Sequence, residues 1–194
     1  MNYLIIVNKN NRIPTNWKNK IQLVKTKSLD GRIIEVEKDA LDNFNKLKKE
    51  ANEIGIEIGI NDGYRSEEEQ EEIQSRLKEI KGIEYVQQYV AEAGYSEHHT
   101  ALAIDVGLRQ NGQLIQENEE GNVKKEIYER LHPLLAKYGF ILRYPKGKEE
   151  ITGYRYEPWH IRYIKDKEKA SEIMANNLSL EEYLESKKII IKKI

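Results

Sequence analysis

The sequence contains no cysteine. This absence excludes disulfide bridges, thiolate metal sites and cysteine nucleophiles. Any metal ion must therefore be held by histidine, aspartate or glutamate. The chain has four histidines, which keeps the search short: His98, His99, His132 and His160.

An excess of one charge and long hydrophobic runs are also lacking. The 32 basic residues nearly balance the 33 acidic ones, whereas a nucleic-acid-binding protein usually has a basic excess. The apolar run at the N-terminus, Tyr3–Val7, is far shorter than the roughly 20 residues of a membrane span. It also lacks the basic region and cleavage site of a signal peptide. We therefore expect no nucleic-acid partner, no membrane span and a cytoplasmic location.

The length and composition suit one compact domain over residues 1–194 with a real hydrophobic core, since 39% of the residues are hydrophobic. Apolar spacing, capping boxes (Ser66 with Glu69, and Ser179 with Glu182) and Asp39 as a cap predict helices. The predicted helices cover residues 39–54, 66–80, 83–91 and 123–138, with a short one after Ser179.

Short apolar or alternating segments predict the strands, which are Tyr3–Val7, Ile56–Ile60, Ala101–Val106, Phe140–Tyr144 and Tyr154–Tyr163. Asn61-Asp62-Gly63 indicates a turn. The order of these elements is typical of an α+β fold, with a small central antiparallel sheet flanked by helices. The charged tail after Leu184 is left open, as an added strand or a contact with a partner.

Three segments concentrate polar groups beside strand-like backbone. They are Gly63-Tyr64-Arg65-Ser66 followed by Gln70, the run from Ser96 to Asp105, and Glu157-Pro158-Trp159-His160. A charged aspartate within Ala101–Val106 is costly to bury without a partner. If that partner is a metal ion, His98 and His160 complete a set of two imidazoles and one carboxylate. Such a set suits zinc and leaves a fourth position for water.

The same residues also have ordinary structural explanations. An inward aspartate often pairs with arginine, and a histidine near a strand is often only hydrogen-bonded. His99 would face away from a ligand at His98 in an extended segment, and His132 precedes a proline in an apolar helix. Spacing alone therefore leaves the metal site as one of two interpretations.

The motifs together resemble the VanY/VanXY-type D-alanyl-D-alanine metallopeptidases. The resemblance rests on Ser96-x-His98 with Asp105, on Glu157-x-x-His160, on Gly63-Tyr64-Arg65-Ser66 with Gln70, and on the block from Tyr138 to Pro145. It covers approximately residues 55–165. Within this group, the motifs are most similar to those of the bifunctional D,D-dipeptidase/D,D-carboxypeptidases. Two positions depart from the family pattern, because Ala101 stands where glycine is usual and His99 where glutamine is common.

The resemblance implies a zinc site on the sheet, formed by His98, Asp105 and His160. It also implies that Glu157 is the general base that activates water and that Arg65 stabilises the oxyanion. The structural alternatives are a surface glutamate and an arginine that shapes a turn.

Four further residues are candidate substrate contacts: Gln70, Ser96, Trp159 and Asp62. Gln70 and Ser96 are expected to hydrogen-bond substrate, although Ser96 could simply shape its loop. Trp159 is expected to wall the pocket, or else to belong to the core. Asp62 could meet the free ammonium group of a dipeptide, but Asn-Asp-Gly is also an ordinary turn.

The expected activity is zinc-dependent hydrolysis of the bond to a C-terminal D-alanine, in D-Ala-D-Ala or in peptidoglycan pentapeptide precursors. One alternative is an L,D-carboxypeptidase or an endolysin-like peptidase that acts on assembled cell wall. Another is an inactive wall-binding module, against which the presence of Glu157 argues. The sequence leaves open the preferred substrate length, the tolerance of D-serine or D-lactate, and the oligomeric state.

Overall fold

The structure is a computed structural model that describes residues 2–115 and 124–187. Its centre is a five-stranded antiparallel sheet in the order β3-β4-β7-β6, with β5 paired to β4. These strands are β3 (Glu57–Asp62), β4 (Ala103–Gln110), β5 (Gln113–Leu114), β6 (Phe140–Leu142) and β7 (His160–Tyr163). A separate antiparallel hairpin joins β1 (Leu23–Lys27) to β2 (Ile33–Glu37).

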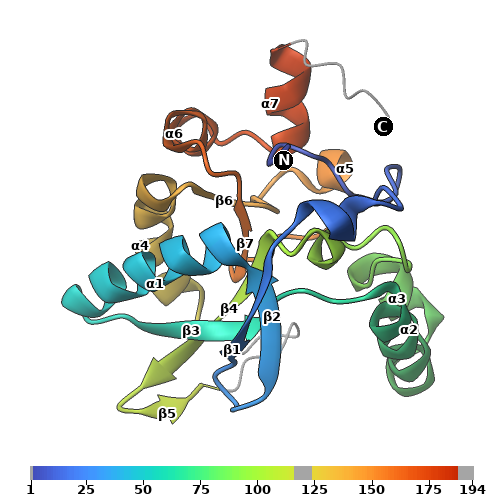
Figure 1. Cartoon of the computed structure of the whole chain (residues 1–194), viewed down its shortest axis with the longest axis horizontal. Coiled ribbons are helices and arrows are strands. Elements are labelled where there is room, and N and C mark those ends of the chain that lie inside the picture. The colour runs from blue at the N-terminus through green and yellow to red at the C-terminus, as the bar shows by residue number, and fades with distance from the viewer. Residues whose placement is uncertain (1, 116–123, 188–194) are drawn as a thin grey trace.

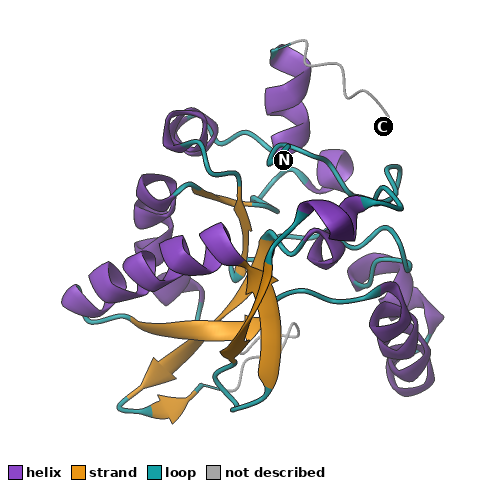
Figure 2. Ribbon diagram, viewed as in Figure 1, coloured by secondary structure: helices purple, strands orange, loops and turns teal. Residues whose placement is uncertain are grey.

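Helices surround this sheet (Figures 1 and 2). The α-helices are α1 (Lys38–Glu53), α2 (Glu67–Lys81), α3 (Ile83–Tyr89), α4 (Lys125–Leu135), α5 (Glu149–Thr152), α6 (Lys167–Ala175) and α7 (Leu180–Ser186). Three short 3₁₀ helices are η1 (Trp17–Lys20), η2 (Glu97–Thr100) and η3 (Ala136–Tyr138). None of the helices in the described part of the chain has the length and apolar character that a membrane crossing requires.

The main core lies between the sheet and the helices α1 and α4. Ala40, Phe44, Leu47 and Ala51 repeat every three or four residues and form the buried face of α1. Phe44 meets Phe140 of β6 edge to face, with ring centroids 6.5 Å apart. A smaller cluster joins β6 to α6 and α7. The sheet is therefore supported by packed helices, and its strands can carry the site.

The predicted α+β class with a central antiparallel sheet is confirmed. The predicted helices agree with α1, α2, α3, α4 and α7, and both predicted capping boxes are present. Two details differ. The cap of α1 is Glu37 rather than Asp39, since the Glu37 carboxylate accepts from the Ala40 amide. The chain also continues as strand through Asp62 before it turns.

Three strand predictions need correction. Tyr3–Val7 is not a strand, because the carbonyl groups of Tyr3 and Ile5 accept hydrogen bonds from Arg162 instead of a neighbouring strand. The strand predicted over Tyr154–Tyr163 covers only His160–Tyr163. The one predicted from Ala101 begins at Ala103, because Ala101 has a left-handed backbone with φ 59°.

Three smaller differences complete the comparison. The strand expected over Phe140–Tyr144 ends at Leu142. The β1–β2 hairpin, α5 and α6 were not predicted. Val123, the predicted start of the helix before Gly139, and the tail from residue 188 onward lie outside the described residues.

Candidate metal centre and active site

Three elements bring His98, Asp105 and His160 together. Asp105 of β4 and His160 of β7 are direct partners in the antiparallel register of these strands, so both side chains stand on the same face. His98 comes from η2, the 3₁₀ turn that precedes β4. The potential ligand atoms of the three residues all lie within 4.8 Å of one another.

The donor set fits a zinc ion. Nε2 of His98 lies 3.3 Å from Oδ2 of Asp105, and Nδ1 of His160 lies 2.9 Å from Oδ1. Despite this short contact, Oδ1 of Asp105 is buried and has no hydrogen-bond partner of good geometry. This is expected if Oδ1 and the imidazole nitrogen both point at a shared metal ion and not at each other. Two imidazoles and one carboxylate form a zinc site with one position left for water or substrate.

The second nitrogen of each histidine is also occupied. Nδ1 of His98 donates to the carbonyl oxygen of Gly63 at 2.6 Å, which leaves Nε2 for the metal. Nε2 of His160 lies 3.3 Å from Oε2 of Glu97, which leaves Nδ1 for the metal. Such outer contacts fix the tautomer and the orientation of a ligand. Gly63 is required there because a Cβ atom would lie 2.6 Å from the carbonyl oxygen of Glu35.

The electrostatics of the cluster favour a charged carboxylate. Burial opposes ionisation of Asp105, but His98 and His160 outweigh it and hold its pKa well below the usual range. Burial alone would lower the pKa of His160, but its contacts with Asp105 and Glu97 raise it to about 10. His160 is therefore protonated in the metal-free site at neutral pH, and zinc binding must release that proton.

A cavity of about 140 Å³ opens over these three residues. Glu157 lines it, with Oε2 3.7 Å from Nδ1 of His160. Four other predicted site residues share the lining: Arg65, Gln70, Ser96 and Trp159. The structure thus gathers all three predicted metal ligands, the predicted base and most of the predicted substrate contacts around one space.

Arg65 enters this cavity from the loop between β3 and α2. Its Nη2 contacts Oδ2 of Asp62 at 2.6 Å, and its Nη1 donates to Oε1 of Gln70 at 2.7 Å. Its Nε is buried and has no hydrogen-bond partner among the described residues. Asp62 does not line the cavity, and its carboxylate holds the guanidinium instead. The Gln70 amide group donates to the carbonyl oxygen of Ala91, so Gln70 reaches the site through Arg65.

The two remaining histidines have structural contacts, as the sequence indicated. Nδ1 of His99 donates to the carbonyl oxygen of Arg65, and Nε2 accepts from the Gly94 amide. His132 contacts the carbonyl oxygen of Pro158 through Nε2. Burial lowers the pKa of both imidazoles, so both are neutral at neutral pH. Neither lies in the ligand cluster.

Sequence reasoning overlooked a buried ionic group behind His160. Glu97 contacts Arg143 and Arg162, and the side chains of all three are inaccessible to solvent. The sequence nevertheless contained a signal for this ionic group. Arg143 and Arg162 each stand in an otherwise apolar segment, and a buried arginine needs a carboxylate partner. Glu97 stands directly beside the ligand His98.

The chain is similar in sequence to two bacterial proteins. The chain is 37% identical over 194 residues to the putative carboxypeptidase YodJ of Bacillus subtilis (strain 168), covering 97% of this chain and 69% of the relative. It is 40% identical over 129 residues to the bifunctional D-Ala-D-Ala dipeptidase and carboxypeptidase VanXYC of Enterococcus gallinarum, covering 66% of each. The chain thus spans about two thirds of the length of these relatives.

Solved structures share the fold. The vancomycin-resistance D,D-pentapeptidase VanY, determined in complex with Zn(II), superposes with a TM-score of 0.76 at 30% identity, over 95% of this chain and 99% of the other. The LD-carboxypeptidase LdcB superposes with a TM-score of 0.74 at 37% identity, over 95% and 86%.

The family model of VanY, D-alanyl-D-alanine carboxypeptidase, matches residues 33–166, which include every ligand and cavity residue named above. With two histidines, one aspartate and a glutamate around one cavity, this chain belongs to the VanY family of metallopeptidases.

Proposed function

We propose that this protein is a zinc-dependent peptidase that hydrolyses the bond to a C-terminal D-alanine, in D-Ala-D-Ala and in peptidoglycan pentapeptide precursors. The observation that carries the proposal is the position of Glu157 and Arg65. Both line the cavity that opens over the His98, Asp105 and His160 cluster. The names of the relatives and the VanY structure with Zn(II) point to the same chemistry.

In this proposal His98, Asp105 and His160 would hold a zinc ion, which would supply Lewis acidity to a water molecule and to the scissile carbonyl. The Glu157 carboxylate would accept a proton from the attacking water and deliver it to the leaving amine. Its carboxylate is mostly buried and lies 3.7 Å from a ligand nitrogen, which places it at the edge of the metal position. A water between Glu157 and the ligands is therefore within reach.

Arg65 stabilises the negative charge that develops on the substrate. The guanidinium is already held by Asp62 and Gln70, so it needs no reorganisation when charge develops. Its Nε has no hydrogen-bond partner among the described residues and supplies a donor. Ser96 and Trp159 line the remaining wall, where they orient the short substrate and exclude water.

The test is direct. Purified protein is incubated with D-Ala-D-Ala and with a muramyl pentapeptide, and released D-alanine is quantified before and after treatment with a chelator. We expect release from both substrates, loss on chelation, and recovery when zinc is restored. Absence of release from both substrates in zinc-loaded protein would refute the proposal.

A second candidate is L,D-carboxypeptidase activity, and the superposition with LdcB at 37% identity favours it. The same catalytic residues would serve both reactions, since only the residue before the cut bond differs in chirality. A tetrapeptide with an L-residue before its terminal D-alanine separates them. Faster release from the tetrapeptide than from the pentapeptide would assign the chain to this second activity.

A further inference from the structure

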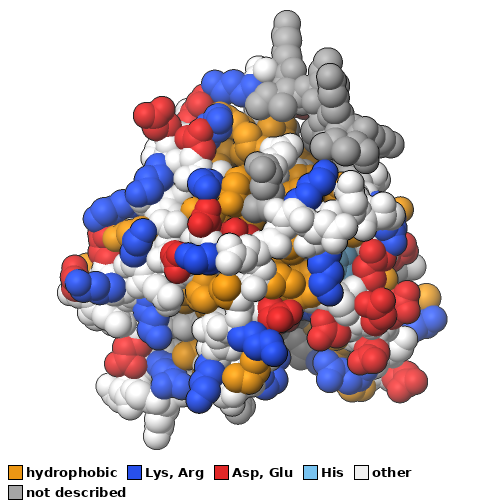
Figure 3. All heavy atoms as spheres, in the orientation of Figure 1, with side chains coloured by type: hydrophobic (Ala, Val, Ile, Leu, Met, Phe, Trp, Pro, Cys, Tyr) orange, Lys and Arg blue, Asp and Glu red, His pale blue; other side chains and the backbone are white. Residues whose placement is uncertain are grey.

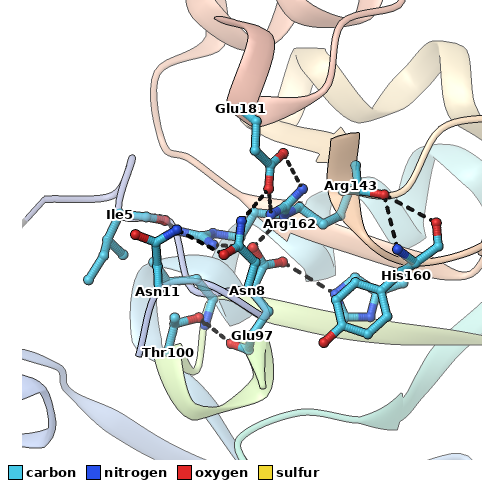
Figure 4. Close-up of polar contacts among 12 residues, drawn as sticks. Ile5, Asn8, Asn11, Glu97, Thr100, Arg143, His160, Arg162 and Glu181 are labelled. Carbon is cyan, nitrogen blue, oxygen red and sulfur yellow. Dashed lines mark hydrogen bonds and ion pairs between the residues drawn. The ribbon is translucent and has the colours of Figure 1, made fainter. Parts of the chain in front are cut away.

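We infer that Glu97 is a positioning residue for the metal ligand His160. Figure 4 shows its carboxylate between the His160 ring and the two buried arginines. Oε2 faces Nε2 of His160 at 3.3 Å, whereas Oε1 accepts from Nε of Arg143 at 2.5 Å and from Nη1 of Arg162 at 2.6 Å. One oxygen is thus held by two cations, and the other is directed at the imidazole.

This arrangement determines which nitrogen of His160 is available to a metal. Arg143 and Arg162 both donate to Oε1 of Glu97, and these two guanidinium cations favour a charged carboxylate. The other oxygen, Oε2, faces Nε2 of His160 and favours a proton on that nitrogen. The lone pair of Nδ1 is then directed at Asp105 and the metal position.

The two arginines are fixed in turn by segments outside the region matched by the family model. Glu181 of α7 contacts Arg143 with both oxygens, at 2.9 and 2.6 Å. The carbonyl oxygens of Tyr3 and Ile5 accept from Nη2 of Arg162 at 3.0 and 2.9 Å. Buried ion pairs contribute little net stability compared with apolar packing. The position of Glu97 beside a ligand is better explained by its effect on His160.

Two variants test the inference. Glu97→Gln removes the charge, and Glu97→Asp keeps the charge but withdraws the carboxylate from His160 by one methylene. For each variant that is folded by circular dichroism, the zinc dissociation constant is measured by competition with a chromophoric chelator. We expect zinc binding about 10–100-fold weaker, the usual effect of losing such an outer partner. The visible spectrum of the cobalt(II)-substituted protein should change as well.

Glu181→Gln is the matched control. It removes a carboxylate from the same arginine group but does not touch His160, so zinc affinity should stay within about threefold of the wild type. A Glu97→Asp protein that folds and binds zinc as tightly as the wild type would overturn the inference. Equal weakening by Glu181→Gln would overturn it too, because the effect would then be general destabilisation.

A second inference rests on a different observation and on the proposed function. A cavity of about 400 Å³ adjoins the catalytic one, and the two share Tyr89, Glu157 and Trp159 as a common wall. Its lining carries three cationic side chains, those of Lys125, Lys146 and Arg155, and the anionic ones of Glu149 and Glu157. We propose that this adjoining cavity binds an acidic part of the peptide on the amino side of the cut bond.

Charge distinguishes the adjoining cavity from a smaller neighbouring one. This smaller cavity, of about 200 Å³, shares Val90 and Ala91 with the catalytic cavity, and its lining carries one cation, Lys9, and one anion, Glu92. The adjoining cavity is both larger and richer in cations. The guanidinium of Arg155 lies over the Tyr89 ring, 5.1 Å from its centroid, at the boundary between the two spaces.

The test compares two substrates. In the double variant Lys146→Glu with Arg155→Glu, kcat/KM for a pentapeptide that carries a free side-chain carboxylate should fall at least tenfold more than kcat/KM for D-Ala-D-Ala. Salt should reduce this difference, because exposed charges are screened. Lys48→Glu on α1 is the control and should leave the ratio unchanged. An unchanged ratio in the double variant would overturn the assignment. Wild-type protein inactive on both substrates would instead refute the proposed function.

Discussion

At the scale of single residues, the proposed function assigns metal binding and chemistry to different side chains. The potential ligand atoms of His98, Asp105 and His160 form one cluster, whereas Glu157 and Arg65 line the cavity that opens over it. Substitutions should therefore separate zinc binding from turnover.

Glu157→Gln keeps the size and polarity of the side chain but removes the base. Turnover should fall by about 10²–10⁴-fold, the usual loss when general acid–base catalysis is removed. Zinc content by elemental analysis should stay near one ion per chain. Near-normal turnover in this variant would mean that another group activates the water.

The histidine substitutions give the opposite pattern. His98→Ala and His160→Ala each remove one of three ligands, so both zinc and turnover should be lost. His132→Ala is the control, because this imidazole hydrogen-bonds the Pro158 carbonyl oxygen and lies outside the cluster. If His132→Ala lost its zinc and His98→Ala kept it, the ligand assignment would be wrong.

The backbone conformation of Ala101 is unfavourable for a residue with a side chain. Ala101 adopts φ 59° at the end of η2, a conformation that costs a non-glycine residue about 1–2 kcal/mol. Ala101→Gly should raise the free energy of unfolding by about 1 kcal/mol, less the loss of one buried methyl group, in urea denaturation. Ala103→Gly, in the regular strand β4, should instead lower it. Lower stability of Ala101→Gly would show that the buried methyl group matters more than the strain.

At the scale of elements, the turn from η2 to β4 and the β4–β7 pair carry the site. η2 carries both His98, a member of the ligand cluster, and Glu97, whose carboxylate faces Nε2 of His160, and the antiparallel register places His160 opposite Asp105. α7 supports them from behind, because its first turn carries Glu181, which contacts Arg143.

The start of α7 can be weakened selectively. Ser179 accepts from the Glu182 amide in a capping box, and replacing such a cap with alanine costs about 1 kcal/mol. Ser179→Ala should therefore lower the free energy of unfolding by about this amount while zinc content is retained. Ser186→Ala, near the other end of α7, should cost less. Loss of zinc from Ser179→Ala at temperatures where it stays folded would mean that α7 controls the metal directly.

At the scale of the whole molecule, both ends of the described chain meet behind the metal site. Asn8 donates to Glu181 across 173 residues, and Arg162 contacts Tyr3 and Ile5. Acidic side chains gather over the α2 end of the face in Figure 3, whereas basic ones are spread over the rest.

The proposed function leads to a prediction about substrate. If the enzyme removes a C-terminal residue, one free terminal carboxylate should orient the short substrate in the catalytic cavity. Amidation of the terminal D-alanine should therefore abolish release of the terminal residue, measured by chromatography of the products. Equal cleavage of the amide, or activity on intact cell wall alone, would indicate an endopeptidase.

Local sequence was enough for the features that depend on local physics. Helical spacing and capping boxes predicted α1, α2 and α7. The motifs around Arg65, His98 and Glu157 named several residues that line the cavity, but only through their resemblance to the VanY/VanXY-type peptidases. Helix periodicity and capping arise within a few residues, so they can be read along the chain.

Tertiary structure decided the contacts between residues far apart. Only the β4–β7 register places Asp105 opposite His160, and only the folded chain brings Glu97 to Arg143 and Arg162, which lie 46 and 65 residues away. Tertiary structure also decided that Tyr3–Val7 does not form the strand that its apolar pattern predicted. The carbonyl groups of Tyr3 and Ile5 accept hydrogen bonds from the buried guanidinium of Arg162 instead. A buried charge needs a partner, because burial without one is too costly. No local sequence pattern specifies that partner, so the folded structure determines it.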